Sequence, residues 1–94
     1  MGRREIAKLI DTLTTTPNLN ERGAAGRALA AIGAPAVPAL INVLKTTKSD
    51  DVRGAAAGAL ANIGQPAKKE LTKLLNHKDE NVSYAARRAL EAIN

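Results

Sequence analysis

Apolar residues recur along the chain at intervals of three and four, the spacing that places side chains on one face of an α-helix. In the first such segment Ile6, Leu9, Ile10 and Leu13 are apolar, and charged residues fall between them. Further segments follow, separated by short stretches that contain Pro, Gly, Asn or Ser. The pattern predicts six helices, at about residues 3–14, 20–32, 36–46, 50–63, 67–76 and 80–93.

Capping residues mark the ends of these segments. We expect helices to end at Gly33 and Gly64, because glycine readily takes the conformation that terminates a helix. The connections Gly33-Ala34-Pro35 and Gly64-Gln65-Pro66 are short, so we expect the helices that they join to be antiparallel neighbours. The predicted N-caps are Asn20, Ser49 or Asp50, and Asp79.

One stretch of the chain occurs three times. Asp51–Gly64 has a counterpart 31 residues earlier at Asn20–Gly33 and another 30 residues later at Asn81–Asn94. Repeats of roughly 20 to 50 residues are typical of solenoids, in which each unit buries its apolar face against its neighbours. The sequence therefore predicts an all-α solenoid of about three short repeats, in a single domain over residues 1–94.

The two more complete copies can be compared position by position. Arg22 to Thr47 aligns with Arg53 to Lys78, and the positions that agree are mostly small or aliphatic, as helix packing requires. The positions that differ lie almost entirely on the second helix of each pair. Because the core does not hold those positions constant, we expect solvent or a partner there.

The residues also carry a family resemblance. Asp51 to Leu75 follow the pattern D-x-V-R-x-x-A-A-x-A-L-x-x-I-G-x-x-A-x-x-x-L-x-x-L nearly throughout. This pattern resembles the short HEAT-like repeat of the phycocyanobilin-lyase type, a family that spans bilin lyase subunits, scaffold proteins and many small proteins. The resemblance implies an α-solenoid and favours a non-catalytic protein-interaction module.

In that family the second helix of each pair lines the concave, binding side, and an Asp and an Arg at the repeat start bridge neighbouring repeats. The resemblance implies bridging roles for Asp51, Arg22 and Arg53. It also implies a partner-binding face, with apolar residues near its centre and lysines around them, made of Ile6, Ile10, Val37, Pro38, Ile41, Lys45, Lys68, Lys69, Thr72 and Asn76.

Composition removes several kinds of chemistry. Cysteine is absent, so disulfides, thiolate metal sites and cysteine nucleophiles are excluded. The single histidine, His77, is predicted to be an exposed loop residue, because no nucleophile or orienting carboxylate lies at a fixed spacing from it. We expect no catalytic residue, no metal site and no cofactor.

The chain shows no membrane segment. No apolar run approaches the roughly 18 residues of a membrane span, and Lys8 and Asp11 interrupt any signal-peptide core. We therefore expect a soluble, cytoplasmic protein. Fourteen Lys and Arg against nine Asp and Glu give a formal charge of +5, which favours an acidic partner.

Two other functions stay open beside binding of a protein. One is a bilin lyase-like subunit or chaperone that handles a tetrapyrrole, and the other is binding of a nucleic-acid backbone through basic helix faces. Both ligands would favour aromatic contacts, and Tyr84 is the only aromatic residue. The basic residues considered for nucleic acid are Arg3, Arg4, Lys8, Lys68, Lys69, Lys73, Arg87 and Arg88.

The last segment has no helix after it to cover it. It carries more apolar positions than one neighbouring helix pair is expected to bury, so we expect weak homodimerisation through this C-terminal helix. The alternative is a monomer in which Tyr84, Arg87 and Arg88 shield the strip. The apolar strip comprises Val82, Ala85, Ala86, Ala89, Leu90 and Ile93.

Overall fold

The computed structural model describes residues 2–93 and contains six α-helices there. These residues form no strand and successive helix pairs stack on one another, so the predicted all-α solenoid is confirmed. Asn94, the last position of the third copy, lies outside the described residues. The helices are α1 (Arg3–Thr15), α2 (Leu19–Ile32), α3 (Val37–Thr46), α4 (Asp50–Ile63), α5 (Gln65–Leu74) and α6 (Glu80–Ile93), with a 3₁₀ turn at Ala34–Ala36.

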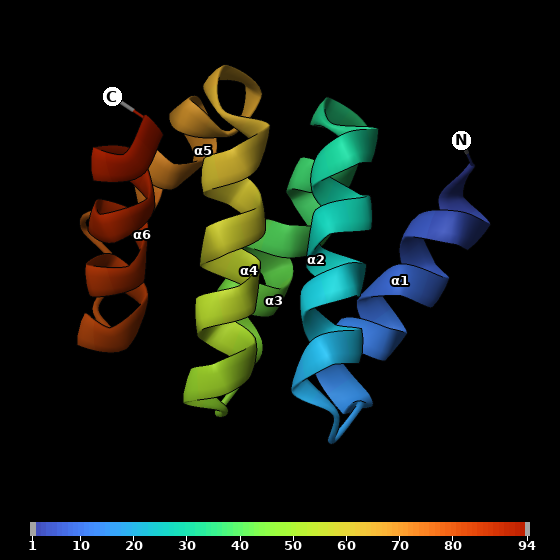
Figure 1. Cartoon of the computed structure of the whole chain (residues 1–94). Coiled ribbons are helices and arrows are strands. Elements are labelled where there is room, and N and C mark those ends of the chain that lie inside the picture. The colour runs from blue at the N-terminus through green and yellow to red at the C-terminus, as the bar shows by residue number, and fades with distance from the viewer. Residues whose placement is uncertain (1, 94) are drawn as a thin grey trace.

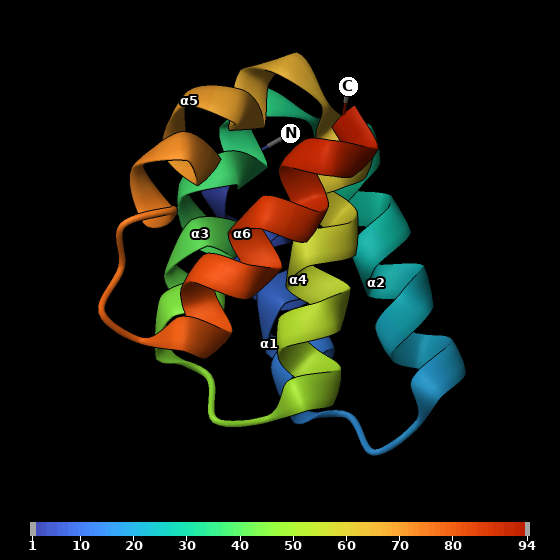
Figure 2. The same ribbon diagram turned by 90° about the vertical axis from the view of Figure 1, so that its left-hand side faces the viewer.

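The helices form two layers. Helices α2, α4 and α6 lie side by side in what we call the even layer, and α1, α3 and α5 form the odd layer behind it (Figure 1). In each layer the middle helix contacts both of the others, so α4 lies between α2 and α6, and α3 lies between α1 and α5. Figure 2 shows the two layers from the α6 end of the stack.

Each even helix packs at least as extensively against the odd helix that precedes it as against its neighbours in the even layer; these pairs are α1 with α2, α3 with α4, and α5 with α6. The tight turns therefore do not join the most extensively packed pairs of helices. Helix α2 meets the next segment mainly at the 3₁₀ turn, and α4 makes few contacts with α5. A short turn fixes where a helix begins, but the apolar faces decide what it packs against.

Glycine ends both helices that precede the tight turns, as predicted. Gly33 and Gly64 have φ of 83° and 82°, a region that residues with a Cβ rarely adopt. Their N–H groups donate to the carbonyls of Leu29 and Leu60, each at 3.1 Å. The two turns are therefore copies of one another in conformation as well as in sequence.

The N-caps agree with the sequence at two helices and differ at one. The Ser49 hydroxyl accepts a hydrogen bond from the Val52 N–H at 3.2 Å, and Asp79 accepts one from the Asn81 N–H at 2.9 Å. The prediction of Asn20 as a cap is wrong. Asn18 has the extended backbone of a cap, and its side chain accepts from the N–H groups of Asn20 and Glu21.

Helix α5 begins and ends two residues earlier than predicted, whereas α4 and α6 have the bounds that the pattern predicts. Pro66 can occupy the first turn of α5, because the N–H group that proline lacks has no partner within a helix there. At the other end the Leu75 N–H donates to the Thr72 carbonyl and the His77 N–H to the Leu74 carbonyl. These bonds tighten the chain into a turn.

The core between the layers is aliphatic and tightly packed. Alanines such as Ala56 and Ala86 are fully buried and let neighbouring helices approach closely. Within residues 2–93 no helix has both the length and the apolar character needed to cross a bilayer. The largest side chains that are fully buried are Leu13, Leu29, Leu40, Leu44, Leu60, Leu71 and Val82.

Candidate protein-binding surfaces

The predicted binding residues all lie in the odd layer or just after it, but they do not share one exposed surface. The sequence placed Val37 and Ile41 at the centre of the face, and this is wrong, because these side chains are only 3% and 7% exposed. Both belong to the core. Helix α3 has α1 and α5 on either side and α4 behind it, so little of its circumference reaches solvent.

Repeat-equivalent positions differ in burial because the three odd helices have different surroundings. Ile6, Val37 and Lys68 are equivalent by the 31-residue spacing; Val37 is buried, whereas Ile6 and Lys68 are half-buried. Ile10, Ile41 and Thr72 are also equivalent, and they are half-buried, buried and exposed in that order. A position on α3 therefore becomes core because a helix packs on each side of it.

In the odd layer, the positions that are exposed on all three helices come one residue after the predicted sets Ile6/Val37/Lys68 and Ile10/Ile41/Thr72. Ala7, Pro38 and Lys69 are equivalent and all exposed, and so are Asp11, Asn42 and Lys73 one turn further along. Of the predicted residues, those that are exposed are Pro38, Lys45, Lys69, Thr72 and Asn76.

Three predicted residues come together in a groove between α1 and the start of α3. Ile6 and Ile10 contribute from α1 and Pro38 from α3. The groove has a volume of about 420 Å³, and Arg3 is its only charged residue. We call it the α1–α3 groove; its lining is completed by Ala7, Pro35 and Ala39.

Lysines dominate the other half of the odd layer. Lys45 and Lys69 are exposed, and Lys73 lies 3.3 Å from the carboxylate of Glu70 on the same helix. Both side chains of that pair are substantially exposed, so water screens their attraction. The odd layer thus presents an apolar groove at the α1 side and a basic surface at the α5 side.

Arg22 and Arg53 bridge neighbouring repeats, as the resemblance implied. Arg22 donates from Nε to the Leu13 carbonyl at 3.0 Å and from its terminal nitrogen to the Thr16 carbonyl at the end of α1. Arg53 donates to the equivalent Thr47 carbonyl at 3.1 Å. The carboxylate paired with Arg53 is that of Asp50, so the role implied for Asp51 is wrong.

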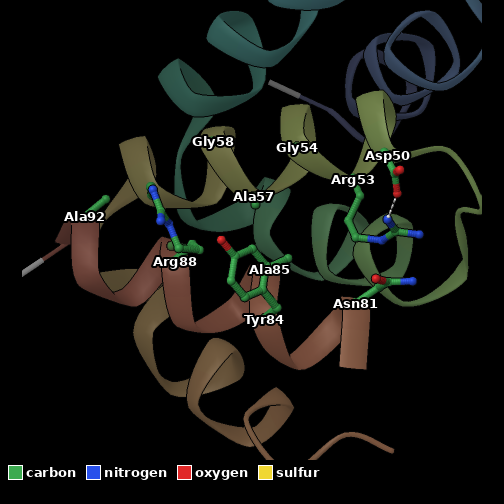
Figure 3. Close-up of a pocket in the computed structure, with 12 residues that line it drawn as sticks. Asp50, Arg53, Gly54, Ala57, Gly58, Asn81, Tyr84, Ala85, Arg88 and Ala92 are labelled. Carbon is green, nitrogen blue, oxygen red and sulfur yellow. Dashed lines mark hydrogen bonds and ion pairs between the residues drawn. The ribbon is translucent and has the colours of Figure 1, made fainter. Parts of the chain in front are cut away.

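A second groove lies on the even layer, between α4 and α6, and the sequence did not reveal it. Figure 3 shows Tyr84 and Arg88 projecting from α6 toward the turns of α4 that carry Gly54, Ala57 and Gly58. The volume is about 490 Å³, and we call it the α4–α6 groove. The signal that could have found it is one position where the copies differ on the first helix, Arg27 against Gly58.

The apolar strip of α6 is mostly covered, contrary to expectation. Val82, Ala85, Ala86 and Ala89 are buried against α4 and α5, and only Leu90 and Ile93 stay half-buried. The small alanines need little area of contact to be covered. Tyr84 is 56% exposed and lies on the side of α6 that faces the α4–α6 groove.

His77 lies in the loop between α5 and α6 and is half-buried rather than exposed. Its Nδ1 accepts a hydrogen bond from the Asp79 N–H at 3.0 Å, which shapes the turn before α6. Among residues 2–93 there is no group of three or more His, Asp or Glu side chains that could hold a metal ion.

Comparison with known proteins places this geometry in a family. A protein-family model described as HEAT repeats matches residues 6–91, a span that includes most of α1 and α6 and all the helices between them. A search among curated proteins found no match.

Proposed function

Because the chain belongs to the HEAT repeat family, whose members are generally protein-interaction scaffolds, we propose that it is a non-catalytic module that binds a protein partner on its odd layer. The observation that carries the proposal is the joining of an apolar groove and a basic surface on one layer. Interfaces commonly combine an apolar centre with a polar rim. The resemblance to the phycocyanobilin-lyase type adds the expectation that this layer is the binding one.

The α1–α3 groove supplies the apolar anchor site. Ile6 and Ile10 are half-buried, so each already has part of its surface in the core and part in the groove. Pro38 adds a rigid, exposed ring on the opposite side. An apolar side chain of the partner that enters the groove loses its own hydration and removes water from all three residues.

The lysines supply the selectivity. Lys45, Lys69 and Lys73 extend the surface toward α5, and Glu70 is the acidic neighbour among them. A partner segment with acidic residues beside its apolar anchor matches this arrangement, and like charges would be repelled. We infer an acidic, amphipathic partner segment.

A protein segment accounts for these features better than nucleic acid or a bilin. Tyr84, the one aromatic side chain, lies on the even layer and cannot stack a base or a tetrapyrrole bound on the odd layer. The lysines also share their layer with an apolar groove that a phosphate backbone does not use.

Selection of displayed random peptides against the protein tests the proposal. We expect enriched peptides to carry acidic residues beside an apolar anchor. Replacing Lys45 and Lys69 together by Glu should weaken such a peptide by about tenfold, because two rim contacts of roughly 0.7 kcal/mol each are lost. Fluorescence polarisation with a labelled peptide measures the change.

The matched control makes the same change in net charge at two lysines outside the odd-layer helices. Lys48 and Lys78 are exposed lysines in loops, so the double replacement of these two by Glu alters net charge equally and leaves the odd-layer helices unchanged. Equal weakening by both double variants would reduce the effect to net charge and refute the proposed surface. Tight, salt-dependent binding of a DNA or RNA duplex, or a bilin absorbance shift without peptide enrichment, would favour the alternatives.

A further inference from the structure

The α1–α3 groove carries its one charge at one end. Arg3 is the first residue of α1, and the rest of the lining comes from Ile, Ala and Pro side chains. The Arg3 side chain is exposed and forms no ion pair with another described residue. Its guanidinium is therefore available to an anion that lies beside an apolar group in the groove.

The next pair of odd helices lacks this arrangement. By the 31-residue spacing, Lys69 on α5 corresponds to Pro38 on α3. Glu70 corresponds to Ala39 in the same way. The position between α3 and α5 therefore has charges of both signs, whereas the α1–α3 groove has one cation and no carboxylate. The lone positive charge belongs to this groove and not to the repeat.

Asp11 gives the groove a direction. Arg3, Ala7 and Asp11 follow one another at intervals of four residues, so they lie on one stripe of α1. Asp11 is exposed and lies about 12 Å from Arg3 along the helix axis, at 1.5 Å per residue. An anion is attracted to the Arg3 end and repelled from the Asp11 end. A ligand with one anionic end is therefore bound in a single orientation.

The last residue of a protein chain combines the two required groups in the smallest space. Its apolar side chain and its terminal carboxylate are attached to the same Cα, so one residue reaches both the apolar lining and Arg3. An arginine can bind a carboxylate through two parallel hydrogen bonds. Capture of a chain-terminal carboxylate is also one of the recurring modes of peptide recognition.

We propose that the α1–α3 groove binds the C-terminal residue of a partner protein, with its apolar side chain against Ile6, Ile10 and Pro38 and its carboxylate at Arg3. The preceding residues of the partner run toward the far end of α3, where Lys45 is exposed and can meet an acidic side chain. This inference rests on the proposed function, because it names the part of the partner that occupies the odd layer.

Two peptides that differ only at the terminus test the proposal. The probe is acetylated Gly-Ser-Gly-Ser-Leu, prepared once as the free acid and once as the C-terminal amide. In a titration followed by two-dimensional amide NMR, we expect the free acid to shift the signals of Ile6, Ala7 and Ala39, which line the groove. The amide should bind about fivefold more weakly, because it loses an exposed charge pair with Arg3.

Adjacent arginines provide the matched control. Arg3→Gln should lower the affinity for the free acid to that for the amide and leave binding of the amide unchanged. Arg4→Gln makes the same change in net charge at an exposed residue of α1 that does not line the groove, so the preference for the free acid should persist. Circular dichroism establishes that both variants are folded.

The proposal would be overturned if neither peptide shifted the groove signals, or if the free acid and the amide bound equally. A preference that survives Arg3→Gln, or that Arg4→Gln abolishes, would also overturn it. Tighter binding of octanoate than of the free acid peptide would assign the groove to a lipid carboxylate instead. If selected peptides bind the odd layer through an internal anchor, the proposed function stands and this inference alone fails.

Discussion

The burial of Ile41 gives a sharp test of how the odd layer is built. Ile41 on α3 and Thr72 on α5 occupy equivalent repeat positions, yet Ile41 is 7% exposed and Thr72 is exposed. Replacing each by Glu therefore places the same side chain at the same repeat position, once in the core and once on the surface. We expect Ile41→Glu to destabilise the protein strongly and Thr72→Glu to change its stability by less than about 0.5 kcal/mol.

The magnitude follows from two contributions. Removing the isoleucine side chain from the core loses about 2 to 3 kcal/mol of hydrophobic stabilisation. A buried glutamate can protonate instead of remaining charged, and at pH 7 that costs at most about 4 kcal/mol, from its ordinary pKa of about 4.3 at roughly 1.4 kcal/mol per pH unit. Because Ile41 lies near the edge of the core, a total of about 3 to 6 kcal/mol is expected.

Urea unfolding followed by circular dichroism at pH 7 measures both variants. A loss of this size consumes much of the stability of a domain of this length, about 5 to 14 kcal/mol, and lowers the midpoint by roughly 2 to 4 M. The loss should also shrink toward pH 4. Burial raises the pKa of the introduced carboxyl in the folded state, so the destabilisation grows as pH rises above the unfolded value of about 4.3.

Equal midpoints for Ile41→Glu and Thr72→Glu would refute the reasoning. That result would mean that position 41 reaches solvent and that α1 and α5 do not enclose α3. A loss that does not diminish at low pH would show that the lost packing, and not the charge, causes the whole effect.

Two further substitutions test the packing and the caps. Ala56→Leu should cost about 1 to 3 kcal/mol, because Ala56 is fully buried and the larger side chain overfills the space between helices; an unchanged melting temperature would contradict the repeat register. Asn18→Ala should cost about 1 kcal/mol, because it removes the side chain that caps α2, whereas Asn20→Ala should cost only a few tenths; the same urea titration compares them, and equal losses would contradict the cap.

The sequence predicted the helices and their order because these depend on local spacing. Helix ends marked by Gly33 and Gly64 were predictable, since a positive φ leaves a strong compositional signal. The cap at Asn18 was not, because Asn18 and Asn20 both suit a cap and only the backbone distinguishes them.

The candidate site was predicted in part, and the error has a clear physical origin. Comparing the repeats treats variation as a sign of exposure, but a position can vary because its neighbours differ from copy to copy. Val37 and Ile41 are buried because α3 lies between α1 and α5. Lys68 and Thr72 are half-buried and exposed because α5 has an odd helix on one side only. Periodicity shows which residues lie on one face of a helix, but it does not show which other helices pack against that face.

The α4–α6 groove escaped prediction because it is made by the lack of side chains. In the sequence Gly58 looks like any other small residue that lets helices pack closely. Only the structure distinguishes it from Gly26, because a Cβ on Gly58 would meet nothing within 4 Å. Tyr84 departs from the repeat in the opposite direction, with a large residue at the position where α4 has Gly54. Together they give the groove a flat side on α4 and a projecting side chain on α6.

The position of a helix in the stack therefore decides what a repeated position does. In the α1–α2 and α3–α4 connections Arg22 and Arg53 hold the end of the odd helix, whereas Ser83 at the third equivalent position donates to the Glu80 carbonyl within its own helix. The last pair is thus held by packing, without an arginine across its loop. On α6, Tyr84 and Arg88 line the α4–α6 groove. The copies differ mostly on the odd helices, and Gly58 and Tyr84 add two differences on the even layer, so each layer presents a surface of its own.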